Sequence, residues 1–211
     1  MWQLYQFPLC PFSRKVRLLL GEKGVGYELV RESPWQRRDE FLDMNPAGQT
    51  PVMVEPNRAL VLIDSMAICE YLEELHPEPA LIGATPEARA VVRMLIRRID
   101  SDVVAPMGTA FRSSEGLPMF KDRMRCVPEG ADTLKACARD GMARFDAWLA
   151  EREWLAGDRF SLADILLFCF LEFGASVGQP MPAELAHLAA WRERVAAHPS
   201  AARSANPKDG L

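Results

Sequence analysis

The chain has 211 residues, of which 49% are hydrophobic and 26% are charged, so neither a disordered nor a fibrous protein is expected. The formal net charge of −4 argues against a general nucleic-acid-binding surface, and we expect no nucleic-acid partner. The longest wholly apolar run has seven residues, far fewer than the roughly 20 that span a bilayer, and no secretory signal pattern is evident, so we expect no membrane association.

The first 76 residues alternate between strand-like and helix-like patterns. In chain order the pattern predicts strand, helix, strand, helix, strand, strand and helix at residues 2–6, 12–23, 27–30, 36–44, 52–54, 60–63 and 65–75. A strand, crossover helix and strand normally lie parallel, whereas the two strands around the turn at 55–58 can form a hairpin. This order is typical of an α/β domain.

The composition changes between residues 77 and 86, and no convincing strand follows. Helices are predicted at 87–107, 131–151, 162–176 and 183–197, with an irregular stretch at 108–130 and a loosely held tail from residue 199. Ser161 and Asp164 form a capping-box pattern ahead of an almost entirely apolar helix, which should be the buried centre of this half. We therefore expect an α/β domain at 1–77, a linker at 78–86 and an all-α domain at 87–211.

Cys10 is the cysteine whose setting indicates reactivity. It stands between the first strand and the first helix and precedes Pro11, so it occupies a helix cap, where free amides and the helix dipole favour a thiolate. Arg14 and Lys15 add positive charge. A small, inert cap residue is the alternative interpretation. The other cysteines, 69, 126, 137 and 169, have no such setting, and inert packing is expected of them. An odd cysteine count of this kind fits a reduced, cytoplasmic protein.

The motif around Cys10 is Cys-x-x-Ser, with Ser13 where a second thiol would resolve a mixed disulfide. A single thiolate needs an external thiol to complete a redox cycle, and this points to glutathione.

Two further loops could bind a peptide-like ligand. A cis bond before Pro51 would offer the Thr50 backbone N–H and C=O as a free strand edge, although a trans proline ending a loop is the commoner case. Asp64 and Ser65 precede the third helix, where Ser65 could bind a carboxylate and Asp64 an ammonium group; a plain helix cap is the alternative. The three histidines have no metal-ligand spacing, and no metal is expected.

These residues together resemble the cytosolic glutathione transferase superfamily over essentially the whole chain. The motifs that carry the resemblance are Leu9–Arg17, Asn45–Val52, Asp64–Ser65, Ile68–Leu72 and Gly157–Asp164. The resemblance implies a thioredoxin-like N-terminal domain, an all-α C-terminal domain, a cis bond before Pro51, a homodimer, and a role such as detoxification. Cysteine in Cys-Pro-Phe resembles the omega-like and related cysteine-type members.

The resemblance also implies a role for individual residues. Cys10 stands in the catalytic position, and Arg37 or Arg38 is a candidate for the glycyl carboxylate. Residues implied to bind glutathione, as co-substrate, are Phe12, Gln49, Thr50, Pro51, Asp64 and Ser65. The resemblance also implies an apolar co-substrate pocket between the domains, with the candidate wall residues Met107, Phe111, Arg112 and Phe120. Simple packing between helices explains these four residues equally well.

Three functions stay open from the sequence. Cysteine-type members typically form a mixed disulfide with glutathione, which favours thiol–disulfide exchange by Cys10 over conjugation of glutathione to an electrophile. The second is a protein-binding role: the layout resembles the stringent starvation protein, which binds RNA polymerase, and an arginine stripe at 89, 93, 97 and 98 could be a partner surface. The alternative interpretation of these arginines is a salt-bridged stripe that faces solvent or a second copy of the chain. A specialised dehalogenation or isomerisation is the third.

Overall fold

The computed structural model describes residues 1–55, 57 and 59–205, and its chain divides into two compact units. One unit contains Met1–Leu81 together with the residues from His198 on, and the other contains Ile82–Ala197. The turn predicted at 55–58 includes positions 56 and 58, which lie outside the described residues. No helix among the described residues is long and apolar enough to cross a membrane.

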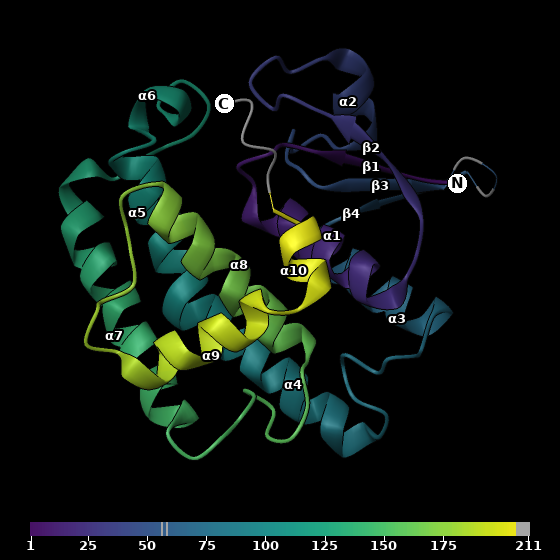
Figure 1. The fold of residues 1–211 in the computed structure, drawn as a ribbon. Coiled ribbons are helices and arrows are strands. Elements are labelled where there is room, and N and C mark those ends of the chain that lie inside the picture. The colour runs from purple at the N-terminus through teal and green to yellow at the C-terminus, as the bar shows by residue number, and fades with distance from the viewer. Residues whose placement is uncertain (56, 58, 206–211) are drawn as a thin grey trace. The chain divides into compact units, whose positions relative to one another are not determined.

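The first unit is built on a four-stranded mixed sheet (Figure 1). Its strands are β1 (Trp2–Gln6), β2 (Tyr27–Arg31), β3 (Val52–Glu55) and β4 (Leu60–Ile63), in the order β2-β1-β3-β4. β1 and β2 are parallel, β1 and β3 are antiparallel, and β3 and β4 form the predicted hairpin. Alternate residues of β1 are buried, as the pleat of a strand with one covered face requires.

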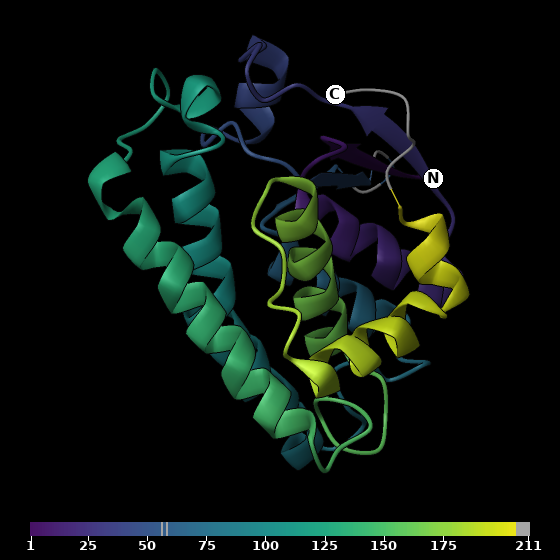
Figure 2. The same ribbon diagram turned by 60° about the vertical axis from the view of Figure 1, so that its left-hand side comes forward.

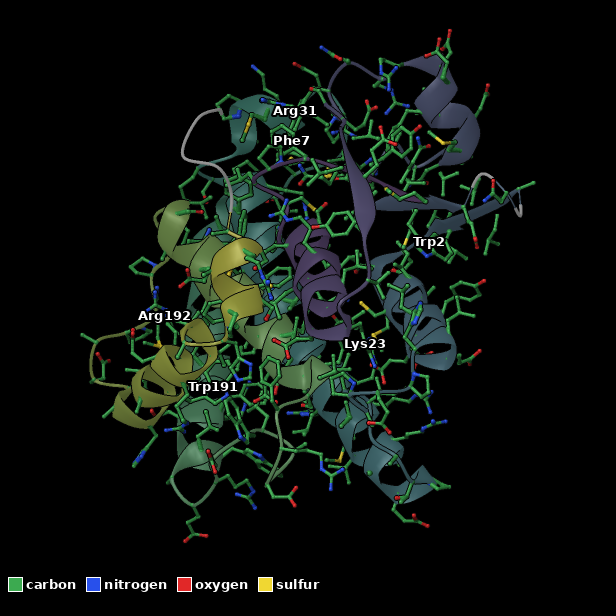
Figure 3. The ribbon with its side chains drawn as sticks, turned by 45° about the vertical axis from the view of Figure 1, so that its right-hand side comes forward. Trp2, Phe7, Lys23, Arg31, Trp191 and Arg192 are labelled. Atoms are coloured by element: carbon green, nitrogen blue, oxygen red, sulfur yellow. The ribbon has the colours of Figure 1, made fainter. Side chains whose placement is uncertain are left out.

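Three helices accompany the sheet: α1 (Pro11–Lys23), α2 (Asp39–Met44) and α3 (Ser65–Leu75). The apolar stripe of α1 is fully buried, and Gly24 ends the helix with the positive φ of 64° that glycine adopts without steric cost. Lys23, at the C-terminal end of α1 (Figure 3), forms an ion pair with Glu73 of α3. This pair joins the far ends of the two helices that carry the candidate site.

The C-terminal segment contradicts the prediction of a loosely held tail. Residues Pro199–Arg203 form α10, which lies beside α1 (Figure 1). The Arg17 guanidinium donates to the Ser204 carbonyl oxygen over 2.8 Å, and the Ser200 hydroxyl donates to Glu22. Such tertiary contacts are invisible in a small, polar sequence pattern. The part of the predicted tail at 206–211 lies outside the described residues.

In the second unit, one long helical run replaces the shorter predicted helix. α4 (Pro86–Ile99), a π-helical turn η2 (Asp100–Val104) and α5 (Ala105–Ser113) follow without a break, and α7 (Ala131–Leu149) runs alongside (Figure 2). The prediction of irregular structure at 108–130 is therefore wrong for the end of α5, for α6 (Leu117–Phe120) and for the short turn η3 (Pro128–Gly130). Pro106 has no N–H to donate, and just before it the Ala105 amide donates to the Asp100 carbonyl oxygen, five residues back, as in a π-helix.

The last two helices of this unit are α8 (Leu162–Ser176) and α9 (Ala186–Ala196). α8 is buried on nearly every side, which confirms it as the centre of the helical unit, and the Ser161–Asp164 capping box is present. Asp164 also accepts hydrogen bonds from the Leu155 amide and from the indole of Trp191, which lies on α9 (Figure 3). One buried carboxylate thus joins the start of α8, the preceding loop and α9.

Glu115, just after α5, gives a pH-dependent contribution to stability. Burial raises the pKa of its carboxyl, but hydrogen bonds from Lys135, Ser114 and Gln179 outweigh burial and lower the pKa from an ordinary 4.5 to about 2. Because the folded pKa lies below the unfolded one, this stabilisation is present above about pH 5 and is lost as the pH falls towards 2.

We expect Glu115→Gln to lower the free energy of unfolding at pH 7 by about 1 kcal/mol, a value discounted for the partial exposure of the side chain. Urea denaturation between pH 7 and pH 2.5 measures it, and the gap between variant and wild type should close as the pH falls. Glu129→Gln, at an exposed position, is the control. A gap that stays constant down to pH 2.5 would show that the Glu115 charge contributes nothing.

Candidate functional site

Cys10 lies where the sequence predicts it, at the cap of α1 with Pro11 in the first helical position. Its backbone is extended, with φ −72° and ψ 113°, and its amide donates to the Phe7 carbonyl oxygen over 3.0 Å. The sulfur accepts no hydrogen bond from the helix amides. Instead the Sγ atom lies 3.4 Å from the carbonyl oxygen of Thr50 and is half-buried. The fold therefore brings together two positions that are 40 residues apart.

The Thr50–Pro51 peptide bond is cis, as the resemblance implied. Thr50 precedes β3 and takes no part in the sheet pairing, which begins at Val52. Its N–H has no hydrogen-bond partner among the described residues, and its carbonyl oxygen faces the Cys10 thiol. A backbone donor and acceptor are thus available beside the thiol, which is what an extended peptide needs to pair with a strand edge.

Asp64 and Ser65 form the start of α3. One Asp64 carboxylate oxygen accepts from the amides of Met66 and Ala67, over 2.7 and 3.1 Å, so the predicted helix cap is present. The rest of the Asp64 carboxylate is exposed, and its backbone has a φ of 73°. Ser65 is 5% exposed, yet within the described chain neither its hydroxyl nor its N–H has a partner. An exposed carboxylate beside two unused donors at a helix start can hold a zwitterionic amino-acid head.

The remaining residues predicted to bind glutathione include Phe12 and Gln49, whose side chains are at least partly accessible. Phe12 is half-buried in the first turn of α1, and the Lys15 ammonium lies 5.9 Å from its ring centroid. The Gln49 side chain is exposed, while its backbone carbonyl accepts from Asn45.

Arg38 forms an ion pair with the buried Glu32, which raises the pKa of the Arg38 guanidinium. Arg37 and Arg38, the two arginines suggested for a glycyl carboxylate, are both exposed.

Three of the four residues predicted to line a co-substrate pocket lie on α5, and the fourth, Phe120, lies on α6. Met107 is fully buried, and the Phe111 ring lies edge-on to Phe120 and Phe173, with ring centroids 5.9 and 5.1 Å apart. Phe120 and Arg112 are half-buried. Met107 and Phe111 are thus packed in the helical unit, whereas Arg112 and Phe120 keep accessible surface.

The prediction of inert packing for the other cysteines holds for two of them. Cys69 and Cys169 are buried, and burial raises the pKa of the Cys69 thiol to about 11. Cys137 is exposed, so the packing prediction is wrong there, whereas Cys126 is half-buried next to Arg112. None of the five cysteines, all of which lie in the described residues, forms a disulfide.

The Ser13 hydroxyl is fully buried and has no hydrogen-bond partner among the described residues. No sequence pattern predicts this. In those same residues no group of histidine, cysteine or carboxylate side chains is arranged to hold a metal ion.

A small mixed sheet with a capping cysteine, a cis-proline loop and an open helix start, followed in the chain by a helical unit, defines the class of thioredoxin-like proteins with a helical second domain. Two family models match: the glutathione S-transferase N-terminal domain over residues 4–80 and the glutathione S-transferase C-terminal domain over residues 131–199. The chain belongs to the glutathione S-transferase family.

Its relatives differ in what their names say. The FtsZ-localized protein A of Caulobacter vibrioides is 36% identical over 76% of this chain and 72% of its own length. Glutathione S-transferase 2 of Saccharomyces cerevisiae is 32% identical over 93% of this chain and 86% of its own length. A stringent starvation protein A homolog of Pasteurella multocida is 40% identical over 68% of this chain and 69% of its own length.

Solved structures agree with this assignment. Gtt2 from Saccharomyces cerevisiae has a TM-score of 0.88 and 32% identity, covering 96% of this chain and 99% of its own. A glutathione S-transferase of Methylobacterium radiotolerans, solved in complex with glutathione sulfonate, has a TM-score of 0.83 and 26% identity, covering 100% of this chain and 97% of its own.

Proposed function

We propose that this protein is a glutathione-dependent transferase that carries out thiol–disulfide exchange with Cys10 as the nucleophile. The observation that carries the proposal is the 3.4 Å contact between the Cys10 sulfur and the Thr50 carbonyl oxygen, beside a Thr50 N–H with no partner in the described chain. A peptide that pairs with Thr50 through its backbone would carry its own cysteinyl sulfur to Cys10.

The exchange takes place in two balanced steps. The Cys10 thiolate attacks the glutathionyl sulfur of a disulfide, a Cys10–glutathione disulfide forms, and the partner thiol leaves as a thiolate. A second glutathione thiolate then attacks the glutathionyl sulfur, glutathione disulfide leaves, and the Cys10 thiolate is restored. Serine at position 13 cannot resolve the mixed disulfide, which is why the second step uses an external thiol.

Glutathione would lie along the three loops of the first unit. Its γ-glutamyl carboxylate would bind the Ser65 hydroxyl and N–H, and its ammonium group would bind the exposed Asp64 carboxylate. Its cysteinyl backbone would pair with Thr50, and Gln49, Pro51 and Phe12 would contact the peptide.

Asp64→Asn should raise the Kd for glutathione about tenfold or more, because it removes a charged partner for the ammonium group. Asparagine caps helices well and tolerates the positive φ, so the thermal midpoint should stay within a degree or two of wild type. Isothermal titration measures the Kd, with Asp158→Asn at an exposed position as the control. An unchanged Kd in a folded Asp64→Asn variant would remove Asp64 from the site.

Conjugation of glutathione to an apolar electrophile is the second enzymatic candidate. The names of Glutathione S-transferase 2 and of the Methylobacterium enzyme support transferase chemistry without choosing between conjugation and exchange. The Cys10 S–H, which donates a weak hydrogen bond to the Thr50 carbonyl oxygen, would be able to donate instead to a bound glutathione thiolate. Measuring both activities on the same preparation decides which dominates.

A protein-binding function without catalysis is the alternative from another class. The name of the Caulobacter relative, FtsZ-localized protein A, refers to another protein and supports this alternative. Two arginines of the stripe considered for such binding already form ion pairs within their own unit. Arg97 pairs with Asp100 over 3.2 Å, and Arg98 pairs with Asp102 over 2.6 Å. Isothermal titration with glutathione discriminates, since a pure binding module would show no heat at millimolar glutathione.

We also propose a cytoplasmic homodimer. Val91 and Met94 of α4 are 41% and 49% exposed beside the salt-bridged stripe, an apolar surface that a second copy would cover. Sedimentation equilibrium at micromolar concentration should give twice the 23.6 kDa mass of one chain, and a mass of one chain would contradict this.

A further inference from the structure

The Ser13 hydroxyl, in the first turn of α1, is buried without a hydrogen-bond partner in the described part of the chain. Buried polar groups are almost always hydrogen-bonded, because a buried donor without an acceptor costs the free energy of its lost hydration. The buried hydroxyls of Ser113, Ser200 and Ser204 follow this rule, since each takes part in a hydrogen bond. An exception at Ser13 points to a partner that binds the hydroxyl in another state of the protein.

The position of Ser13 in the helix indicates which group that partner is. Cys10 is the cap residue and Pro11 the first helical residue, so Ser13 is the third, whose N–H normally donates to the cap side chain. The Cys10 side chain accepts no such hydrogen bond, and the Ser13 N–H has no partner among the described residues. Because the Cα–Cβ bonds of a helix tilt towards its N-terminus, the Ser13 side chain extends towards the cap. One residue thus offers two free donors to a cap acceptor.

The protonation state of Cys10 decides whether these donors can be used. As a thiol, Cys10 is itself a donor, and its sulfur lies 3.4 Å from the Thr50 carbonyl oxygen. A thiolate can only accept, so it would lose this hydrogen bond and would face the negative end of the carbonyl dipole. A rotation about the Cα–Cβ bond of Cys10 would turn the sulfur towards the first turn of α1, where the free donors and the helix dipole favour negative charge.

The charged side chains on the elements around Cys10 are engaged elsewhere. The Arg14 guanidinium donates to the Ser204 hydroxyl over 3.4 Å, and the Lys15 ammonium lies 5.9 Å from the ring centroid of Phe12. At the other end of α1, two further pairs form: Glu22 with His198, and Lys23 with Glu73. Within the described residues, no charged side chain forms a hydrogen bond or an ion pair with Cys10. Stabilisation of a thiolate therefore depends on the start of α1.

We propose that the Ser13 hydroxyl donates a hydrogen bond to the Cys10 thiolate and holds the nucleophile at the start of α1. Ser13 is then a positioning residue for Cys10, in addition to standing where a resolving thiol would be. The inference rests on the proposed function in taking Cys10 as the nucleophile, but the hydrogen bond itself requires no glutathione.

The pH dependence of Cys10 alkylation tests this hydrogen bond without glutathione. The full chain is treated with iodoacetamide between pH 5 and pH 10, and modification of Cys10 is followed by mass spectrometry of its peptide. Ser13→Ala should raise the midpoint of the rate profile by about one pH unit, because the thiolate loses a charge-assisted hydrogen bond. The midpoint is measured because the rate at one pH also depends on the nucleophilicity of the thiolate. An unchanged midpoint would overturn the proposal.

Thermal stability distinguishes this role from a structural one. The Ser13 hydroxyl has no partner when no thiolate is present, so Ser13→Ala in a Cys10→Ala background should keep or raise the thermal midpoint. Ser113→Ala is the matched control, because the buried Ser113 hydroxyl accepts from the Val127 amide. This control should lose thermal stability and keep the wild-type alkylation profile. A clear loss of thermal stability on Ser13→Ala in the Cys10→Ala background would show a structural hydroxyl and overturn the proposal.

Ser13→Cys tests whether a side chain at position 13 reaches the Cys10 sulfur. With glutathione disulfide, the wild type should stop at the Cys10–glutathione disulfide. In the variant, the new thiolate at position 13 should attack the Cys10 sulfur, so that an internal disulfide forms and glutathione leaves as a thiolate. Mass spectrometry separates the two products. A persistent glutathione adduct on Cys10 in the variant would overturn the inference and leave the proposed function intact. An unmodified Cys10 in both proteins would contradict the proposed function, and the alkylation profile would still decide on Ser13.

Discussion

Cys10→Ser is expected to lower the rate of glutathione-dependent disulfide exchange by roughly 1000-fold or more, because losing a nucleophile alone removes most of the chemistry. A serine hydroxyl cannot form the mixed disulfide on which the cycle depends. The side chain is nearly isosteric and its contact is a single weak hydrogen bond to the Thr50 carbonyl, so folding and glutathione affinity should change little. Exchange is measured by following glutathione disulfide formation from a small mixed disulfide.

The same variant separates the two enzymatic candidates. A serine hydroxyl can still donate a hydrogen bond to a bound glutathione thiolate, so any conjugating activity should survive or rise in Cys10→Ser. Cys126→Ser and Cys137→Ser alter the two other accessible thiols and should keep the wild-type exchange rate. Exchange that continues at the wild-type rate in a folded Cys10→Ser protein would rule out the Cys10 mechanism.

Asp164→Ala is expected to cause the largest loss of stability, about 4 kcal/mol in the free energy of unfolding. The fully buried carboxylate accepts from the Leu155 amide, the Ser161 amide, the Ser161 hydroxyl and the Trp191 indole, over 3.0, 2.9, 2.7 and 2.8 Å. Alanine leaves these donors buried without an acceptor and also removes the Asp164 half of the capping box of α8. Urea denaturation at pH 7 measures the loss.

Asp164→Asn keeps the prediction testable if the alanine variant does not fold. Asparagine keeps one acceptor oxygen and turns its amide towards the other pair of donors, so about 2 kcal/mol should be lost. Asp158→Ala, at an exposed position, should change stability by less than about 0.5 kcal/mol. A loss of less than about 1 kcal/mol in the free energy of unfolding of Asp164→Ala would contradict the proposed role of this carboxylate in stabilising the helical unit.

Local patterns predict most of the elements because their physical causes are local. The strands at 2–6 and 60–63 and the helices at 65–75 and 162–176 have the predicted bounds, since turn residues, caps and apolar periodicity mark both ends. The helix predicted at 183–197 is shorter, Ala186–Ala196. The missed structure depends on tertiary contacts: α10 is held by Arg17 and Glu22 of α1, 187 and 178 residues away from their partners.

The candidate site was predictable in part for the same reason. Cys10 and Asp64 are visible in the sequence because a helix start has a local signature. The contact between the Cys10 sulfur and the Thr50 carbonyl needs the β1–β3 pairing, which no short motif contains. The exposure of Cys137 is a property of packing.

A crystal structure of the protein soaked with glutathione disulfide tests the central claim most directly. We predict a covalent bond of about 2.0 Å between the glutathione sulfur and the Sγ atom of Cys10, with the glutathione backbone paired to Thr50. Glutathione bound with its sulfur apart from an unmodified Cys10 would contradict exchange and favour conjugation. A site that stays empty at saturating glutathione disulfide would contradict the enzymatic account altogether.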